Sequence, residues 1–214
     1  MKKGSIWIIG GLLLLAAALG LTAYNYYDQN RAGIRTEAAL VQLLPEIEEK
    51  LPDKPEKQSI DEMIELPALQ EDVPYYILNP NMEMPKRQID GIDYIGVLSV
   101  PDLGLELPVA SEWSYEHLKA APCRFSGSVY LSDMVVCAHN YMNHFGTLRN
   151  LTIGAQISFT DMDGNVFKYT VSEMETLQPT EVERMKTGDW DLTLFTCTVG
   201  GRTRLAVRCL AVEE

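Results

Sequence analysis

A cysteine and an arginine flank a glycine-rich turn near the end of the chain. Thr193–Cys197 has the residue types of a β-strand, Gly200-Gly201 forms a turn, and another strand begins near Arg204. Antiparallel strands joined in this way bring Cys197 and Arg204 together across the sheet. A thiolate is a nucleophile, and a neighbouring guanidinium favours the thiolate and stabilises an oxyanion. The pair predicts attack on a carbonyl carbon, although a lone cysteine at a strand end is more often a small buried residue.

A histidine that follows another predicted strand has the chemistry to transfer protons for this thiol. His139 comes directly after the apolar stretch 134–138 and opens a loop. Imidazole acts as a general acid and base near neutral pH. His144 is a rival in the same loop, but a rigid element holds a catalytic group better than the middle of a loop does. We therefore predict His139 as the catalytic base.

Strand alternation assigns the other side chains near this pair. Arg204 and Arg208 share one face of the last strand, and Arg202 belongs to the solvated turn. Arg208 either supports the site or is a surface charge, and the surface charge is preferred. Thr196 either contacts the substrate or is an ordinary strand residue with a satisfied hydroxyl. The remaining cysteines are expected to be buried apolar residues rather than disulfide partners: Cys123, Cys137 and Cys209.

Short strands must position these residues. The alternation of apolar and polar residues predicts strands at 94–100, 105–109, 134–138, 156–160, 166–171, 192–196 and 204–211. Helical turns are expected near 114–120, 147–151 and 181–185. Asp161 and Asp163 flank a hairpin turn, and turn chemistry explains them without a metal. The fold class is therefore all-β with short helices, a closed barrel of about seven or eight strands within residues 91–214.

The N-terminal residues have a different composition. After Lys2 and Lys3 no charge occurs before Asp28, and Ile6–Ala23 is an almost unbroken apolar run. This run is near the roughly 20 residues that span a bilayer and longer than the apolar part of a signal peptide, about 7–15 residues. Residues 1–27 are therefore predicted to be an uncleaved transmembrane anchor, with the lysines cytoplasmic and the rest of the chain outside.

Residues 28–90 are predicted to be a spacer. Residues 31–50 have the apolar spacing of a helix that stops or kinks near Pro45 and forms a simple stalk. Seven of the eleven prolines lie between residues 45 and 85 and alternate with acidic residues. Such a composition favours an extended linker.

Composition excludes several classes of protein. The 214 residues carry 18 basic and 30 acidic side chains, a formal net charge of −12. This acidity disfavours general nucleic-acid binding, because affinity for phosphates needs a basic surface. The hydrophobic share of 46% is too high for a disordered chain, and four cysteines are too few for a disulfide-built scaffold.

Together these motifs resemble the sortase family of Gram-positive bacteria. Thr193-Leu194-Phe195-Thr196-Cys197 matches the TLxTC signature of the family, and Ala138-His139-Asn140 resembles its histidine turn, with alanine in place of glycine. Arg204–Arg208 resembles the final strand, and Tyr94–Val109 is similar to the opening hairpin. The order of anchor, spacer, histidine, cysteine and arginine is also that of a sortase. The resemblance covers about residues 94–211.

The resemblance implies a membrane-anchored cysteine transpeptidase with a single span and an extracellular catalytic domain. Cys197 would cleave an LPxTG-like sorting signal of a surface protein or pilin and form a thioacyl intermediate. His139 would protonate the leaving amine, Arg204 would hold the substrate backbone or the oxyanion, and Thr196 would contact the substrate. An amine of a peptidoglycan precursor or a pilin would release the product, with no metal or cofactor. The sortase class stays open.

Two other interpretations are retained. A cell-surface cysteine peptidase, a hydrolase, would use the same cysteine and histidine with water as the acceptor. Papain-like chains, however, place the cysteine before the histidine and at the start of a helix. A non-catalytic anchored β module for protein binding would explain the anchor, the spacer and the barrel, but it leaves the arrangement of Cys197 and Arg204 to chance.

Overall fold

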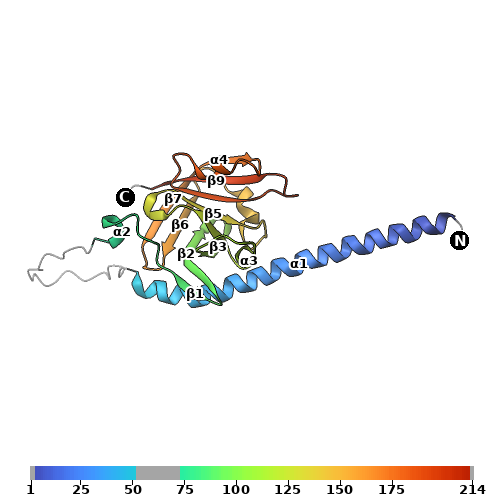
Figure 1. Ribbon diagram of the computed structural model, residues 1–214, viewed down its shortest axis with the longest axis horizontal. Helices are drawn as coiled ribbons and strands as arrows, with labels where there is room; N and C mark the ends of the chain where they lie inside the picture. Colours follow the sequence, from blue (N-terminus) through green and yellow to red (C-terminus); the bar gives the residue numbers. More distant parts are fainter. Residues whose placement is uncertain (1–2, 52–72, 213–214) are drawn as a thin grey trace, which may run out of the picture.

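The computed structural model describes residues 3–51 and 73–212, which form a β-barrel resting on one long helix (Figure 1). Nine strands lie within these residues. They are β1 (Arg87–Ile89), β2 (Ile92–Val100), β3 (Leu105–Ala110), β4 (Cys123–Ser126), β5 (Met134–Ala138), β6 (Gln156–Asp161), β7 (Val166–Leu177), β8 (Leu192–Cys197) and β9 (Arg204–Ala211).

Eight of these strands close the barrel. They follow one another in the order β2-β3-β4-β5-β8-β9-β7-β6, and β6 pairs back onto β2. The pairs β3–β4 and β5–β8 are parallel, and the other pairs are antiparallel. Because the barrel is closed, every strand in it pairs with a neighbour on each side, and the sheet has no open edge. The predicted all-β fold, a closed barrel of seven or eight strands, is confirmed.

Three strands differ clearly from the prediction. β1 lies in the predicted spacer, and β4, which has only four residues and a bulge between Arg124 and Ser126, is also not predicted. β7 continues to Leu177, whereas the strand predicted there ends at residue 171. A bulge between Val171 and Glu173 shifts the register there, where the acidic residues interrupt the apolar pattern.

Short helices connect the strands. They are α2 (Tyr75–Leu78), α3 (Tyr115–Leu118), α4 (Val182–Lys186) and the 3-10 turns η1 (Pro101–Leu103), η2 (Val129–Leu131) and η3 (Phe145–Asn150). The three predicted helical turns correspond to α3, η3 and α4. The side chain of Ser114 accepts a hydrogen bond from the backbone N–H of His117 and caps α3. The ring of Tyr76 on α2 stacks on Tyr130, with the ring centroids 4.8 Å apart.

The first helix, α1 (Lys3–Lys50), is longer than expected. Its N-terminal part extends past the barrel (Figure 1) and includes a segment long and apolar enough to cross a membrane. The helix does not stop at Pro45, so of the two predicted alternatives, a stop or a kink, the stop is wrong. Proline removes one helical hydrogen bond, but burial of Leu43 and Ile47 on either side of it stabilises the helix.

The C-terminal part of α1 packs against the barrel instead of forming a simple stalk. The buried residues recur every three or four positions, which places them on one face of the helix. They are Ala32, Thr36, Ala39, Leu43 and Ile47. Several of them share a core cluster with Tyr94 and Val97 of β2. The proline-rich part of the predicted spacer, residues 52–72, lies outside the described residues.

Leu43→Ala should lower the free energy of unfolding by about 2–5 kcal/mol, because it leaves a cavity between the helix and the barrel. Leu43 is fully buried, whereas Val41 on the same helix is exposed. Thermal unfolding of the full chain in detergent, followed by circular dichroism, measures the change. Val41→Ala is the control and should leave the melting temperature nearly unchanged. Equal melting temperatures for the two variants would contradict the docking of α1.

Candidate active site

Cys197 and Arg204 face each other across two neighbouring strands. Cys197 is the last residue of β8, Arg204 is the first of β9, and the register pairs them directly. In the loop between them, Gly200 and Gly201 have φ angles of +85° and +71°, which glycine adopts without strain. The Oγ1 atoms of Thr198 and Thr203 are 2.8 Å apart and close the base of this loop. The glycine-rich turn thus has the geometry that the sequence predicts.

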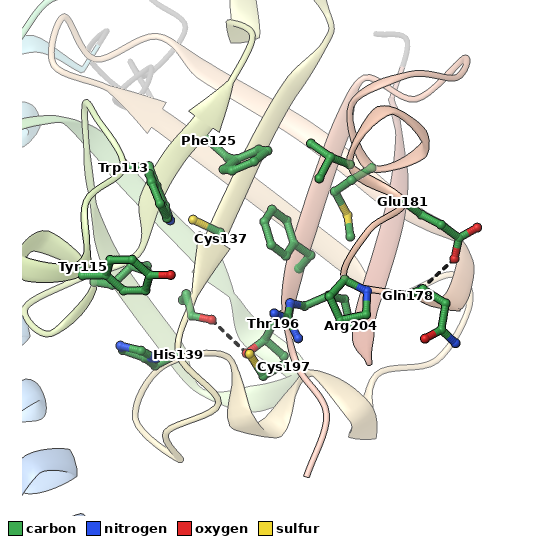
Figure 2. Close-up of a pocket in the computed structure, with 16 residues that line it drawn as sticks. Trp113, Tyr115, Phe125, Cys137, His139, Gln178, Glu181, Thr196, Cys197 and Arg204 are labelled. Carbon is green, nitrogen blue, oxygen red and sulfur yellow. Dashed lines mark hydrogen bonds between the residues drawn. The ribbon is translucent and has the colours of Figure 1, made fainter. Parts of the chain in front are cut away.

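His139 leaves its strand at the same end of the barrel. β5 runs parallel to β8 with Ala138 beside Thr196, so His139 and Cys197 each follow a paired residue. The Thr196 hydroxyl donates to the carbonyl oxygen of Ala138 at 2.8 Å and fixes this alignment. Figure 2 shows Cys197 between His139 and Arg204. Within the described residues no hydrogen bond joins the Cys197 sulfur to His139, as is common before a substrate binds.

These three side chains line one cavity of about 400 Å³. The strand ends form its reactive part, and two walls rise from other segments. One wall is aromatic and contains Trp113, Tyr115, Phe125 and Phe195; the other comes from the β7–β8 connection and contains Gln178, Pro179, Glu181, Val182 and Met185. The ring of Phe125 meets those of Trp113 and Phe195 edge to face. The cavity therefore suits a ligand with apolar side chains beside a polar reacting group.

The surroundings of His139 favour its neutral form. The side chain is partly buried, and this burial lowers the pKa of His139 below the ordinary value for histidine. The carboxylate of Asp28 opposes that change and the ammonium group of Lys119 adds to it. A neutral imidazole can accept a proton, as a general base must.

His144 has a different environment from His139. It is fully buried and does not line the cavity. Its Nε2 atom is 3.0 Å from the hydroxyl oxygen of Thr36, and this hydroxyl donates its single proton to the carbonyl oxygen of Ala120. His144 must therefore be the donor, with its proton on Nε2. Burial lowers the pKa of His144 to about 4, so the ring stays neutral at pH 7. Because the ring is fully buried outside the cavity, it does not contact a substrate bound there.

The other three cysteines are buried and free, as predicted: Cys123, Cys137 and Cys209. Burial raises the pKa of Cys123 and Cys209 to about 12 and also raises that of Cys137. These thiols stay protonated at neutral pH and are poor nucleophiles. Cys197 is the cysteine that combines partial exposure with a neighbouring guanidinium among the described residues.

The prediction that Arg208 is a surface charge is wrong. Its side chain is 1% exposed and donates two hydrogen bonds to Oε1 of Glu175, at 2.9 and 2.7 Å. It also donates to the carbonyl oxygens of Arg184 and Met185 and to the hydroxyl of Thr193. Strand alternation predicts the face of β9 on which Arg208 lies. It does not predict that α4 covers this face. Arg208 therefore ties α4, one wall of the cavity, to the barrel.

Two features of the site are not predicted from the sequence. The aromatic wall comes from separate segments, and aromatic residues at such positions are equally common in cores. Tyr141 follows His139 by two residues, and the two ring centroids are 4.8 Å apart. Its nearness in sequence is the one signal that could have placed Tyr141 at the site.

Comparisons with known proteins agree with this geometry. The family model of the Sortase domain matches residues 98–212. Sortase C1 of pilus island 1 of Group B Streptococcus is 22% identical, with a TM-score of 0.51 over 56% of this chain and 65% of that chain. Sortase C of Streptococcus pneumoniae is 23% identical, with a TM-score of 0.50 over 56% of this chain and 70% of that one.

A third solved structure with the same fold is a different sortase. The sortase D5 transpeptidase of Clostridium perfringens is 19% identical, with a TM-score of 0.52 over 59% of this chain and 83% of that one. No curated protein matches the chain. At these identities the structures show a shared fold, and the match covers less than two thirds of the Group B Streptococcus sortase. The family model covers more than half of the chain, and the chain therefore belongs to the sortase family.

Proposed function

We propose that this protein is a membrane-anchored cysteine transpeptidase that cleaves an LPxTG-like sorting signal. The observation that carries the proposal is the meeting of Cys197, His139 and Arg204 at one cavity. They lie at the ends of three neighbouring strands. β5 pairs with β8 in parallel, and β8 pairs with β9 in antiparallel orientation. Membership of the sortase family supports the same chemistry.

The first half-reaction forms a thioacyl intermediate. The thiolate of Cys197 attacks the carbonyl carbon of the threonine–glycine bond, a carbon–sulfur bond forms, and the carbon–nitrogen bond breaks. The neutral imidazole of His139 first takes the proton of the Cys197 thiol, which generates the attacking thiolate, and then gives this proton to the leaving amine. Arg204 stabilises the oxyanion. Its Nη1 donates to the carbonyl oxygens of Gly201 and Thr203, both at 3.1 Å, which orients the guanidinium.

The second half-reaction transfers the acyl group to an amine. The amine of a peptidoglycan precursor or a pilin attacks the thioester carbonyl, and His139 accepts the proton that this amine loses. A new amide bond forms as the carbon–sulfur bond breaks, and the proton on His139 returns to the sulfur, which restores the Cys197 thiol and the neutral imidazole. These steps need only the side chains of the chain and its two substrates.

Thr196 contributes by position. Its side chain is buried, and its hydroxyl proton is already donated to the carbonyl oxygen of Ala138. Donation to an oxyanion would require this bond to break, which supports the alternative of a satisfied strand residue over a direct substrate contact. In that role Thr196 aligns the strand ends that carry His139 and Cys197.

The proposed location follows from α1. Residues 1–27 form a single-pass anchor in the cell membrane, residues 28–90 connect it to the barrel, and residues 91–214 form the extracellular catalytic domain. The apolar segment of α1 supports the anchor, because a helix of about 20 apolar residues spans a bilayer. Surface proteins or pilins with sorting signals are the proposed donor substrates.

Cys197→Ala should abolish transfer, because it removes the atom that forms the thioacyl bond. The full chain in detergent is incubated with an LPxTG-type peptide, with and without an amine acceptor, and mass spectrometry identifies the products. Cys209→Ala, which removes a buried thiol next to the start of β8, is the matched control and should retain transfer.

Three outcomes separate the interpretations. A product that requires both the amine and Cys197 supports the transpeptidase. Cys197-dependent hydrolysis with no amine product supports a cysteine peptidase and contradicts the proposal. No turnover across a panel of sorting signals supports a non-catalytic binding module.

A further inference from the structure

We propose that α1 belongs to the catalytic machinery, with Asp28 and Tyr141 acting as positioning residues that orient His139. This inference rests on the proposed function of His139. The part of α1 that follows the apolar segment then acts directly on His139, the acid–base group. The contacts of the loop that follows His139 carry the argument.

The loop after His139 is bound to α1 at two positions. Near its start, the hydroxyl of Tyr141 donates to Oδ2 of Asp28. Further along, Nδ2 of Asn143 donates to the backbone carbonyl oxygen of Gln29 at 2.9 Å. These residues are more than 110 positions apart in the sequence, so the contacts join two separate parts of the fold.

A third contact and a close approach complete this interface. The buried ring of His144 donates to Thr36, two helical turns beyond Asp28. A Cβ atom added at Gly33 would lie 2.1 Å from Nδ2 of Asn143. Glycine in the middle of a helix costs about 1 kcal/mol relative to alanine, but here it makes room for the loop.

Tyr141 connects this interface to His139. Its ring packs on the imidazole, with centroids 4.8 Å apart and an interplanar angle of 34°. Burial raises the pKa of Tyr141, so its hydroxyl stays protonated and remains a donor to Asp28. Asp28 therefore holds in place the Tyr141 ring, and the Tyr141 ring limits how the imidazole of His139 can turn.

Asp28 also acts through its charge. Burial lowers the pKa of His139, the carboxylate of Asp28 raises it, and Lys119 lowers it. The other titratable or charged groups near the ring are Tyr141 and His144 in its own loop, and Tyr115, Cys137, Glu181, Cys197 and Arg204, which line the same cavity. Of the two charges that shift the pKa of His139, Asp28 is the one that favours the imidazolium, the form that protonates a leaving amine.

Asp28→Asn tests the charge while keeping an oxygen that can accept the Tyr141 hydrogen bond. The titration of His139 is followed by NMR in the full chain, in detergent and without substrate. We expect the titration midpoint of His139 to fall, and transfer at pH 7 to fall about 3- to 30-fold. Glu49→Gln removes the same charge from an exposed position on the same helix and should change neither measurement.

Tyr141→Phe tests the orientation. It keeps the ring against His139 but removes the hydrogen bond to Asp28. We expect kcat to fall several-fold with KM nearly unchanged, because the acid–base group is misplaced while the cavity walls are intact. A variant that only loosened the structure would lower the melting temperature and leave the kcat of the folded protein unchanged.

The two proposals can fail separately. If Asp28→Asn leaves the His139 titration at its original midpoint, the inference about α1 is overturned, whatever the enzyme activity is. If the midpoint falls but no substrate is transferred, the coupling holds and the transpeptidase proposal fails. Unchanged kcat in Tyr141→Phe would limit α1 to a structural role and overturn the orienting function.

Discussion

His139→Ala should lower kcat/KM for acceptor-dependent transfer by about 10²- to 10⁴-fold, the range for loss of a general acid–base group. His139 lines the cavity beside Cys197, and among the described residues no other histidine does so. Without the imidazole, the leaving amine must take its proton from water. The rates are measured with a saturating amine, so that the loss reports on the acylation step.

His144→Ala is the matched control, because it removes an imidazole from the same loop. It should lower the melting temperature, since it breaks the bond to Thr36 and leaves a cavity. The transfer rate of the folded protein should fall about tenfold or less, in the range for coupling through a neighbouring loop. A greater loss in His144→Ala than in His139→Ala would reverse the assignment of the two histidines.

The parts of the site that could be predicted depend on local chain geometry. The pairing of Cys197 with Arg204 follows from two strands and a glycine-rich turn, all within twelve residues. The bounds of β5 and β9 agree with the predicted ranges because their apolar residues are uninterrupted or alternate regularly. His139 was predicted by its place after a strand, which needs no knowledge of its partners.

The parts that could not be predicted depend on distant segments. A helix with small buried residues at positions 32, 36 and 39 has the same pattern whether it packs on a barrel or stands alone as a stalk. The burial of Arg208 needs α4, which lies more than twenty residues earlier and is only five residues long. His144 was a rival for catalysis because its partner Thr36 is 108 positions away.

This dependence on distant segments explains why the polar residues were harder to place than the apolar ones. An apolar residue can be buried against many neighbours, so its pattern along the chain is informative. A buried polar residue needs particular partners, and those of Arg208 come from β7, α4 and β8. Sequence alternation gives the face on which such a residue lies, but not its partners.

Arg208→Met should therefore have the largest effect on stability, lowering the free energy of unfolding by about 3–5 kcal/mol. The change leaves the carbonyl oxygens of Arg184 and Met185 without their donor, and it removes one of the two cations bound to Glu175. Urea denaturation of the full chain in detergent measures the loss. Arg202→Met, at an exposed position in the β8–β9 turn, is the control and should change stability little.

A second substitution separates the charge from the packing. In Arg208→Met with Glu175→Gln, a neutral amide replaces the partly buried carboxylate, so part of the lost stability should return. The cavity gives an independent measure, because Met185 on α4 lines its wall. Loosening of α4 should raise KM for the peptide more than it lowers kcat, since Cys197, His139 and Arg204 stay on their strands. Equal stability of the Arg208→Met and Arg202→Met variants would show that α4 is held by other contacts, and the link between the buried arginine and the cavity wall would fail.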